Sequence, residues 1–213
     1  RQDGMKIIGY REAMNLPSLP ASMVVVGSGA IGSEFAGFYR AMGTEVTLVE
    51  FMPRVLPIED EEVSRTLERA FKKAKMKIMV NSTVEKVDTA GEKCIVTIKT
   101  AKGEETVEAD VVLSSVGITP NLEGIGLEEA GVKTDRGRVV VDEFYRTSAS
   151  GVYAIGDIVP GPALAHVASA EAIVCVEKIA GKSPHPVDYA NIPGCTYTTP
   201  EVASCGMTEE AAK

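Results

Sequence analysis

The chain has 213 residues, of which 45% are hydrophobic, and its formal net charge is −8. This length fits one large domain or parts of two, and the hydrophobic fraction fits a globular protein with a buried core. The acidic balance argues against nucleic acid or an anionic membrane surface as partner. No apolar run approaches the roughly 20 residues of a transmembrane helix, and no basic-apolar start suggests a signal peptide. We therefore expect a cytoplasmic protein with no nucleic-acid partner and no membrane partner.

The first strand that the pattern predicts is Met23–Val26, which follows a proline-rich linker at 16–20. A glycine-rich run follows this strand directly and opens an amphipathic helix, in the order Gly27-Ser28-Gly29-Ala30-Ile31-Gly32. Gly27 permits a tight turn, Gly29 lets the backbone approach a phosphate, and Gly32 lets the helix lie close to the strand. The helix N-terminus adds free N–H groups and the positive end of a dipole.

The helix after the glycine run shows apolar residues at helical spacing, namely Ile31, Phe35, Phe38 and Met42. We expect this stripe to face the sheet, with Ala36 small enough for close packing. Gly43 is placed as a C-terminal cap.

An acidic residue, Glu50, closes the next apolar strand, 46–49. A carboxylate at that place accepts hydrogen bonds from the adenosine ribose and repels a 2′-phosphate, so the pattern predicts a site for NAD rather than NADP. The alternative is an acid that merely caps a surface strand. Arg54 lies a few residues further on, where it either weakens this preference or faces solvent.

The following elements predict the fold class. A helix over 60–75 leads to a third strand at 77–80, which gives a βαβαβ unit and hence a parallel sheet. Three short strands at 83–87, 94–99 and 104–113 then have hairpin spacing and indicate an inserted antiparallel meander. The prediction is an α/β protein with a Rossmann-like parallel sheet and an inserted β-meander, with Gly117 at the ligand-binding edge of the sheet.

The composition changes after residue 138. Strands are expected at 139–141 and 152–155, the second running into Gly156-Asp157, and a mostly apolar helix is expected over 163–180. The four cysteines show no C-x-x-C spacing, and with two histidines they predict no metal site.

These motifs resemble the flavoprotein disulfide reductases, and within them the members that oxidise dihydrolipoamide. The resemblance covers nearly the whole chain and depends on five runs in family order, namely 26–34, 49–57, 115–121, 152–157 and 164–166, with 197–203 similar to the start of the family's dimerisation domain. It implies the FAD/NAD(P)-binding fold. It also implies that residues 1–20 end an FAD domain, 21–137 form the NAD-binding domain, 138–190 form a second FAD-contacting segment, and 191–213 begin the interface domain. On this reading the chain is an internal fragment of a longer enzyme.

The resemblance further implies roles for single residues. Glu34 lies beside the flavin, Ile31 lies near the nicotinamide, Val84 packs near the adenine, and Gly117 contacts the cofactor through its backbone. The Asp157 carboxylate accepts a hydrogen bond from the flavin ribityl chain, and the flavin ring is lined by Ala163, Leu164, Ala165 and His166. Each has a plain structural alternative: a core valine for Val84, a turn glycine for Gly117, a dipole-favoured acid for Glu34 and a structural histidine for His166.

The implied activity oxidises dihydrolipoamide and passes electrons through a disulfide and FAD to NAD⁺. The implied partners are dihydrolipoamide on 2-oxo acid dehydrogenase complexes or the glycine cleavage system, and a second subunit in a homodimer. No catalytic residue of the dithiol half-reaction is expected in these 213 residues, so the chain alone is expected to be inactive. The alternatives are another reductase of the family, of the glutathione or mercuric type, and a stand-alone NAD-binding module.

Overall fold

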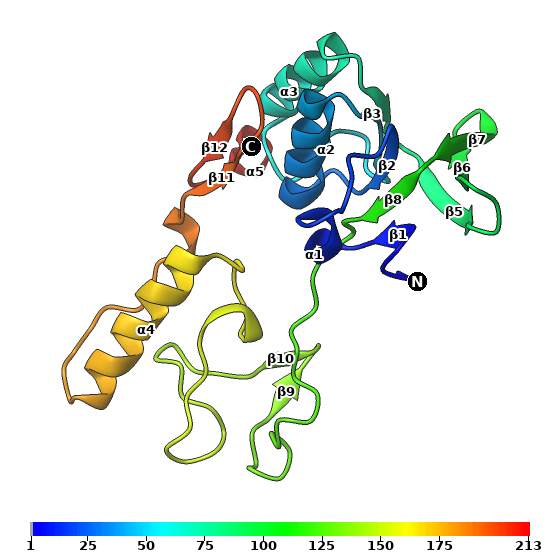
Figure 1. Ribbon diagram of the computed structural model, residues 1–213. Helices are drawn as coiled ribbons and strands as arrows, with labels where there is room; N and C mark the ends of the chain where they lie inside the picture. The colour runs from blue at the N-terminus through cyan, green and yellow to red at the C-terminus, as the bar shows by residue number, and fades with distance from the viewer. Residues whose placement is uncertain (1) are drawn as a thin grey trace. The chain divides into compact units, whose positions relative to one another are not determined.

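The computed structural model describes residues 2–213 and divides the chain into two compact units (Figure 1). The first unit comprises residues up to Gly117 together with 193–213, and the second comprises residues 118–192. The two units are described separately below. The functional boundaries predicted at 137/138 and 190/191 remain a prediction.

The first unit is built on a five-stranded, entirely parallel sheet. Its strands, in spatial order, are β1 (Ile7–Ile8), β8 (Val111–Ser114), β2 (Ser22–Val26), β3 (Glu45–Val49) and β4 (Lys77–Met79). Helix α2 (Ala30–Met42) connects β2 to β3, and helix α3 (Glu61–Lys73) connects β3 to β4. The predicted βαβαβ unit is therefore confirmed. Strand β1 and the short helix α1 (Tyr10–Ala13) lie within residues 1–20, which are expected to end an FAD domain and for which the sequence pattern predicts no strand or helix.

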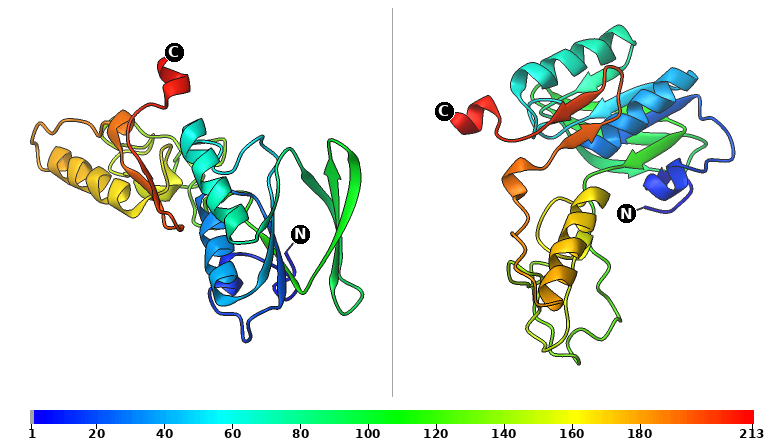
Figure 2. Two further views of the ribbon diagram at one scale, coloured as in Figure 1. Left: turned by 90° about the horizontal axis from the view of Figure 1, so that it is seen from above. Right: turned by 90° about the vertical axis from the view of Figure 1, so that its left-hand side faces the viewer.

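Alternate residues of each strand pack on opposite faces of this sheet, as the two-residue period of a strand requires. Val25 and Leu48 lie in the cluster with Leu67 and Phe71 of α3, while Val24 and Val49 lie in a second cluster with Val96 and other residues of the antiparallel strands. The unit thus has three layers, with α2 and α3 on one side of the parallel sheet and a smaller antiparallel sheet on the other (Figure 2).

The antiparallel layer is the predicted meander, with one difference. It consists of β5 (Thr83–Asp88), β6 (Cys94–Thr100) and β7 (Gly103–Ala109). The single strand predicted over 104–113 is wrong, because the chain breaks at Asp110 and enters a different sheet as β8. The amide N–H of Ser22 donates a hydrogen bond of 2.8 Å to the Asp110 carboxylate. This bond attaches the break to the start of β2.

The apolar stripe predicted for α2 is only partly right. Phe38 and Met42 are more than half exposed, and the face toward the sheet is formed by smaller residues and one tyrosine, namely Gly32, Ser33, Ala36 and Tyr39. Small residues are favoured there because the helix lies close to the strands. Gly43 ends α2 with φ of +108°, as predicted.

The C-terminal segment forms a hairpin against the first unit. Its strands are β11 (Gly194–Thr196) and β12 (Val202–Ser204), followed by the short helix α5 (Glu209–Ala212). Val202 is buried in the cluster that includes Ala36 and Phe71. Whether this hairpin begins a dimerisation domain remains a prediction.

The second unit is mostly loop, with one long helix. It holds β9 (Thr134–Asp135), β10 (Arg138–Val139), the 3₁₀ turns η1 (Gly156–Ile158) and η2 (Tyr189–Asn191), and helix α4 (Ala165–Ile179). The strand expected at 139–141 is only the two-residue β10, and the one expected at 152–155 is reduced to a single bridge between Tyr153 and Arg146. A small core of its own includes Val132, Val139, Ala154 and Val159. Among the described residues, no helix is long and apolar enough to cross a membrane.

The contrast between two phenylalanines tests the assignment of the core. Phe71 is 1% exposed and Phe38 is 57% exposed. We expect Phe71→Ala to lower the free energy of unfolding of the first unit by about 3–5 kcal/mol, because it leaves a cavity under the sheet. Phe38→Ala should lower it by less than about 1 kcal/mol. Urea denaturation followed by circular dichroism measures both, and equal losses would contradict the layer assignment.

Candidate functional site

The glycine run lies between the carboxyl end of β2 and the start of α2, and packing dictates two of its three glycines. Gly27 has φ of +98°, and a Cβ there would lie 2.6 Å from the Ser115 carbonyl oxygen. At Gly32 a Cβ would lie 1.9 Å from the Gly27 carbonyl oxygen. Neither position can hold a side chain without moving backbone, so the tight turn and the close helix are as the sequence predicted.

Gly29 differs from the other two glycines. It is the N-cap residue of α2, it is exposed, and a Cβ built on it meets no atom within 4 Å. No side chain caps the helix, and the first N–H groups of any α-helix lack intrahelical partners. Ala30 and Ile31 continue this first turn. The arrangement is an open cradle of backbone donors at the positive end of a helix dipole, which suits an anionic phosphate.

Glu50 lies beneath this cradle and is hydrogen-bonded to it. Its Oε2 accepts from both the N–H and the hydroxyl of Ser28, each at 2.7 Å, and its Oε1 accepts from Met52 N at 2.8 Å. The residue is only 7% exposed. Since a carboxylate offers about four lone-pair sites, these three donors leave acceptor capacity on Oε1. Glu50 is therefore a fixed acceptor rather than a loose surface acid.

Serine hydroxyls hold the rest of the loop in place. Ser33 Oγ donates to the Ser28 carbonyl at 2.9 Å, and Ser115 Oγ donates to the carbonyls of Val26 and Gly27 at 2.8 and 3.0 Å. Sequence reasoning missed these contacts and the Ser28–Glu50 pair. The only signal was that small polar residues stand beside the glycines.

Arg54 is not free in the loop that follows Glu50. Its Nη1 and Nη2 pair with Oε1 and Oε2 of Glu210 on α5, both at 2.7 Å. The hydrogen bond from Arg54 is the first cause of a lowered pKa for the Glu210 carboxyl. Sequence spacing gave no hint of this partner 156 positions away.

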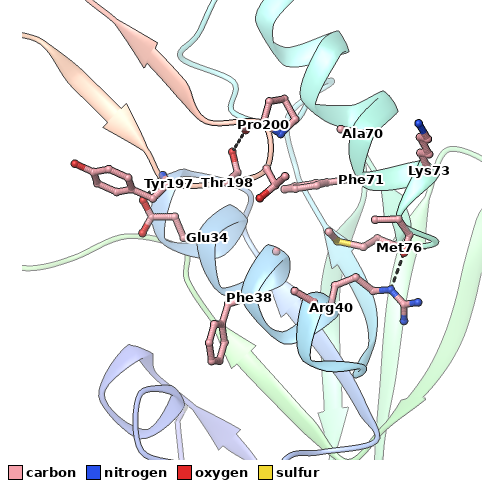
Figure 3. Close-up of a pocket in the computed structure, with 14 residues that line it drawn as sticks. Glu34, Phe38, Arg40, Ala70, Phe71, Lys73, Met76, Tyr197, Thr198 and Pro200 are labelled. Atoms are coloured by element: carbon pink, nitrogen blue, oxygen red, sulfur yellow. Dashed lines mark hydrogen bonds between the residues drawn. The ribbon is translucent and has the colours of Figure 1, made fainter.

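The other predicted residues of the first unit occupy varied surroundings. Val84 is half-buried and packs on the core cluster beneath the meander, which fits its structural alternative. Gly117 is exposed and has φ of +129°. The Glu34 carboxylate accepts from the N–H of Tyr197 at 2.8 Å. Glu34 forms one end of a groove of about 880 Å³ between α2, α3 and residues 197–200, which contains no residue of the glycine run (Figure 3).

The remaining predicted residues lie in the second unit, at the start of α4. Asp157 is exposed in η1, while Ala163 and Leu164 are half-buried and Leu164 is the N-cap residue of α4. Ala165 and His166 are exposed in the first turn of this 15-residue helix. Arg138 Nη1 donates to the carbonyls of Asp157 and Val159 at 3.0 and 2.8 Å, so the loop backbone is held from β10.

A buried carboxylate, which sequence reasoning also missed, holds the other side of that loop. Glu171 of α4 is 1% exposed; its Oε2 accepts from Gly156 N at 2.6 Å and its Oε1 from the Tyr189 hydroxyl at 2.5 Å. The Tyr145 hydroxyl lies 3.1 Å from that of Tyr189. Burial, followed by the hydrogen bond to Glu171, raises the pKa of Tyr189 well above its ordinary value.

With this geometry in place, comparison with known proteins decides the family. A family model described as pyridine nucleotide-disulphide oxidoreductase matches residues 1–172. The chain belongs to this family. FAD and NAD are the cofactors that the family and its dihydrolipoyl dehydrogenases use.

The relatives and solved structures agree with this family. The chain is 47% identical to a dihydrolipoyl dehydrogenase of Rhizobium etli, over 99% of this chain and 44% of the relative. It is 46% identical to a mitochondrial dihydrolipoyl dehydrogenase of Arabidopsis thaliana, over 99% of this chain and 42% of the relative. The crystal structure of LpdA from Mycobacterium tuberculosis matches with a TM-score of 0.90 at 33% identity, covering 99% of this chain and 45% of the other. The chain thus spans less than half the length of these relatives.

The residues of this chain fit the cofactors that the family uses. The open Gly29 and the fixed Glu50 acceptor suit a dinucleotide. The exposed Asp157 carboxylate can accept a hydrogen bond from a ligand hydroxyl, and the N-terminus of α4 suits a group that gains negative charge. No disulfide joins the four cysteines, of which Cys94 and Cys175 are buried. Within residues 2–213, no group of three acidic, histidine or cysteine side chains is arranged to hold a metal ion.

Alanine substitutions should distinguish Gly32, where packing requires a glycine, from Gly29, where the space beside the backbone is open. We expect Gly32→Ala to lower the free energy of unfolding by about 2–3 kcal/mol, because its methyl group would overlap backbone. Gly29→Ala should change it by less than about 1 kcal/mol, since φ of −63° suits alanine and the space is open. Urea denaturation of both variants measures this, and a destabilised Gly29→Ala would show that the cradle is not open.

The buried phenol of Tyr189 gives a prediction about alkaline pH. Its folded pKa is raised above the unfolded value of 10.0, so its stabilising contribution is complete below pH 10 and is lost as pH rises toward the folded value. Tyrosinate absorbance of the wild type minus that of Tyr189→Phe should therefore titrate well above pH 10. A midpoint near 10 in the folded chain would contradict the Tyr189–Glu171 contact.

Proposed function

We propose that this chain carries the NAD site of a dihydrolipoyl dehydrogenase. The observation that supports it most directly is the open space at Gly29, the N-cap residue of α2. At the other two glycines of the loop, Gly27 and Gly32, a side chain would meet backbone atoms. In the proposal the dinucleotide pyrophosphate lies against Gly29 and the N–H groups of Ala30, Ile31 and Gly32. The carbonyls of Val26, Gly27 and Ser28 already accept hydrogen bonds from serine hydroxyls, and the N–H groups at the start of α2 are the donors offered to the phosphate.

Glu50 selects the nucleotide in this proposal. Its remaining acceptor capacity takes a hydrogen bond from the adenosine ribose, and its negative charge disfavours a 2′-phosphate at the same place. The Ser28 and Met52 donors hold the carboxylate in one orientation before the nucleotide arrives. Pre-organisation of this kind reduces the entropy lost on binding.

The second unit supplies residues for the flavin in the proposal. FAD, when bound, relays two electrons between a dithiol and NAD⁺. The Asp157 carboxylate accepts a hydrogen bond from a flavin hydroxyl, and Ala163 to His166 present a helix N-terminus whose dipole stabilises negative charge. The roles proposed for Glu34, Val84 and Gly117 rest on the family resemblance alone.

The activity of the whole protein is part of the same proposal. Dihydrolipoamide would be oxidised to lipoamide, losing two electrons and two protons, while NAD⁺ accepts a hydride and one proton is released. Partner complexes that carry lipoyl groups, a homodimer and a cytoplasmic location are all proposals. The names of several relatives do not favour the cytoplasm, since three of them are named mitochondrial.

Gly29→Ala tests the proposal at its supporting observation. The methyl group would occupy the space through which the backbone approaches the pyrophosphate, so we expect the dissociation constant for NADH to rise at least about tenfold. Because the chain contains no tryptophan, the fluorescence of NADH itself reports binding without interference from indole.

Gly37→Ala is the matched control, since it makes the same change in the same helix with the nearest atom 4.0 Å away. It should leave the dissociation constant for NADH unchanged. The proposal fails if the wild-type chain does not bind NADH, or if Gly29→Ala binds it as tightly as Gly37→Ala does.

A further inference from the structure

Arg54 and Glu210 join the two chain segments of the first unit, up to Gly117 and 193–213, through a two-point ion pair. Both guanidinium nitrogens that take part lie 2.7 Å from a carboxylate oxygen. The partner helix α5 is also held by its backbone, because Glu209 N donates to Asp60 Oδ1 at 2.9 Å, at the start of α3. The pair is thus supported by a second contact and is not an isolated encounter of two long side chains.

The loop that carries Arg54 is attached to the proposed NAD site on both sides of this residue. Two residues before it, Met52 N donates to Glu50 Oε1 at 2.8 Å. Two residues after it, Leu56 N donates to the Ser28 carbonyl at 3.1 Å. Arg54 therefore lies on the stretch of chain that borders the Glu50 carboxylate, where the adenosine ribose is proposed to bind.

We propose that Glu210 is a specificity-determining residue, which favours NAD over NADP by occupying the guanidinium of Arg54. This inference rests on the proposed NAD site. Arginine is well suited to a phosphate because its planar fork binds two oxygens at once. In this chain the fork is already filled by a carboxylate, so Arg54 is not available to a 2′-phosphate that meets the negative charge of Glu50. Glu210 acts through Arg54 and needs no contact with the nucleotide.

The exposure of the pair limits the size of the effect. The side chains of Arg54 and Glu210 are 22% and 51% exposed, so water and salt screen their attraction. Exposed pairs of this kind are weak, and releasing Arg54 from one should improve NADPH binding by about two- to fivefold. The improvement should shrink at about 0.5 M salt, where charges are screened within roughly 5 Å.

The experiment compares the dissociation constants of the 213-residue chain for NADH and NADPH, measured by nucleotide fluorescence at low salt. Glu210→Gln should lower the constant for NADPH by about two- to fivefold and leave that for NADH unchanged. The double variant Arg54→Gln/Glu210→Gln should lose this gain. Glu209→Gln is the matched control: it removes the same charge from the neighbouring position of α5, where the carboxylate pairs with Lys213.

The outcomes separate the inference from the proposed function. A wild-type chain that binds neither nucleotide overturns the proposed site and the inference with it. A chain that binds NADH but whose preference is unchanged in Glu210→Gln overturns the inference alone. An equal gain in Glu209→Gln would indicate a general charge effect, and a gain that persists without Arg54 would indicate a structural effect of α5; either result overturns the inference.

Discussion

The hydrogen bonds between Glu50 and Ser28 are the constraint on which the site depends. They join the end of β3 to the loop after β2, so the acceptor and the phosphate cradle form one rigid body. Burying a carboxylate is unfavourable unless donors satisfy it, and here three donors do so. Separate bonds, from the hydroxyls of Ser33 and Ser115, engage the carbonyls of Ser28 and Val26, while the first N–H groups of α2 have no intrahelical partner. The charge of Glu50 thus shapes the loop as well as the proposed ligand preference.

The second unit repeats this arrangement with different residues. Glu171 is a buried carboxylate with two donors, and it ties the loop before α4 to the helix itself. In both units a glutamate holds an irregular loop beside a helix N-terminus. Glu50 directly follows strand β3, and Glu171 lies within helix α4. A loop held in this way is presented in one conformation, which suits a surface that must meet a flat or charged ligand.

Sequence reasoning predicted the glycines and the parallel sheet because steric rules leave few alternatives at those positions. It failed where several residue types satisfy one pattern. Phe38 and Met42 have the right spacing for a buried stripe, but closeness to the sheet favours Ala36 and Gly32 instead. Ser28 occupies a position of the glycine motif that any residue can fill, so only its small polar side chain hinted at the contact with Glu50. Strand β1 has only two residues, which is too short to show a periodic pattern. The break at Asp110 interrupts a segment whose sequence pattern predicts one continuous strand.

The position of β8 has a consequence for the order of folding. This strand lies inside the parallel sheet, between the edge strand β1 and the central strand β2, yet it is the last of the five to be synthesised. Ile7 pairs with Val112, so β1 and its partner strand are more than a hundred residues apart in the sequence. Until β8 is in place, β2 exposes an unpaired edge, and the meander must already be complete to bring β8 into register. Long-range parallel pairing of this kind is slow to form, so assembly of this sheet is a late, concerted event.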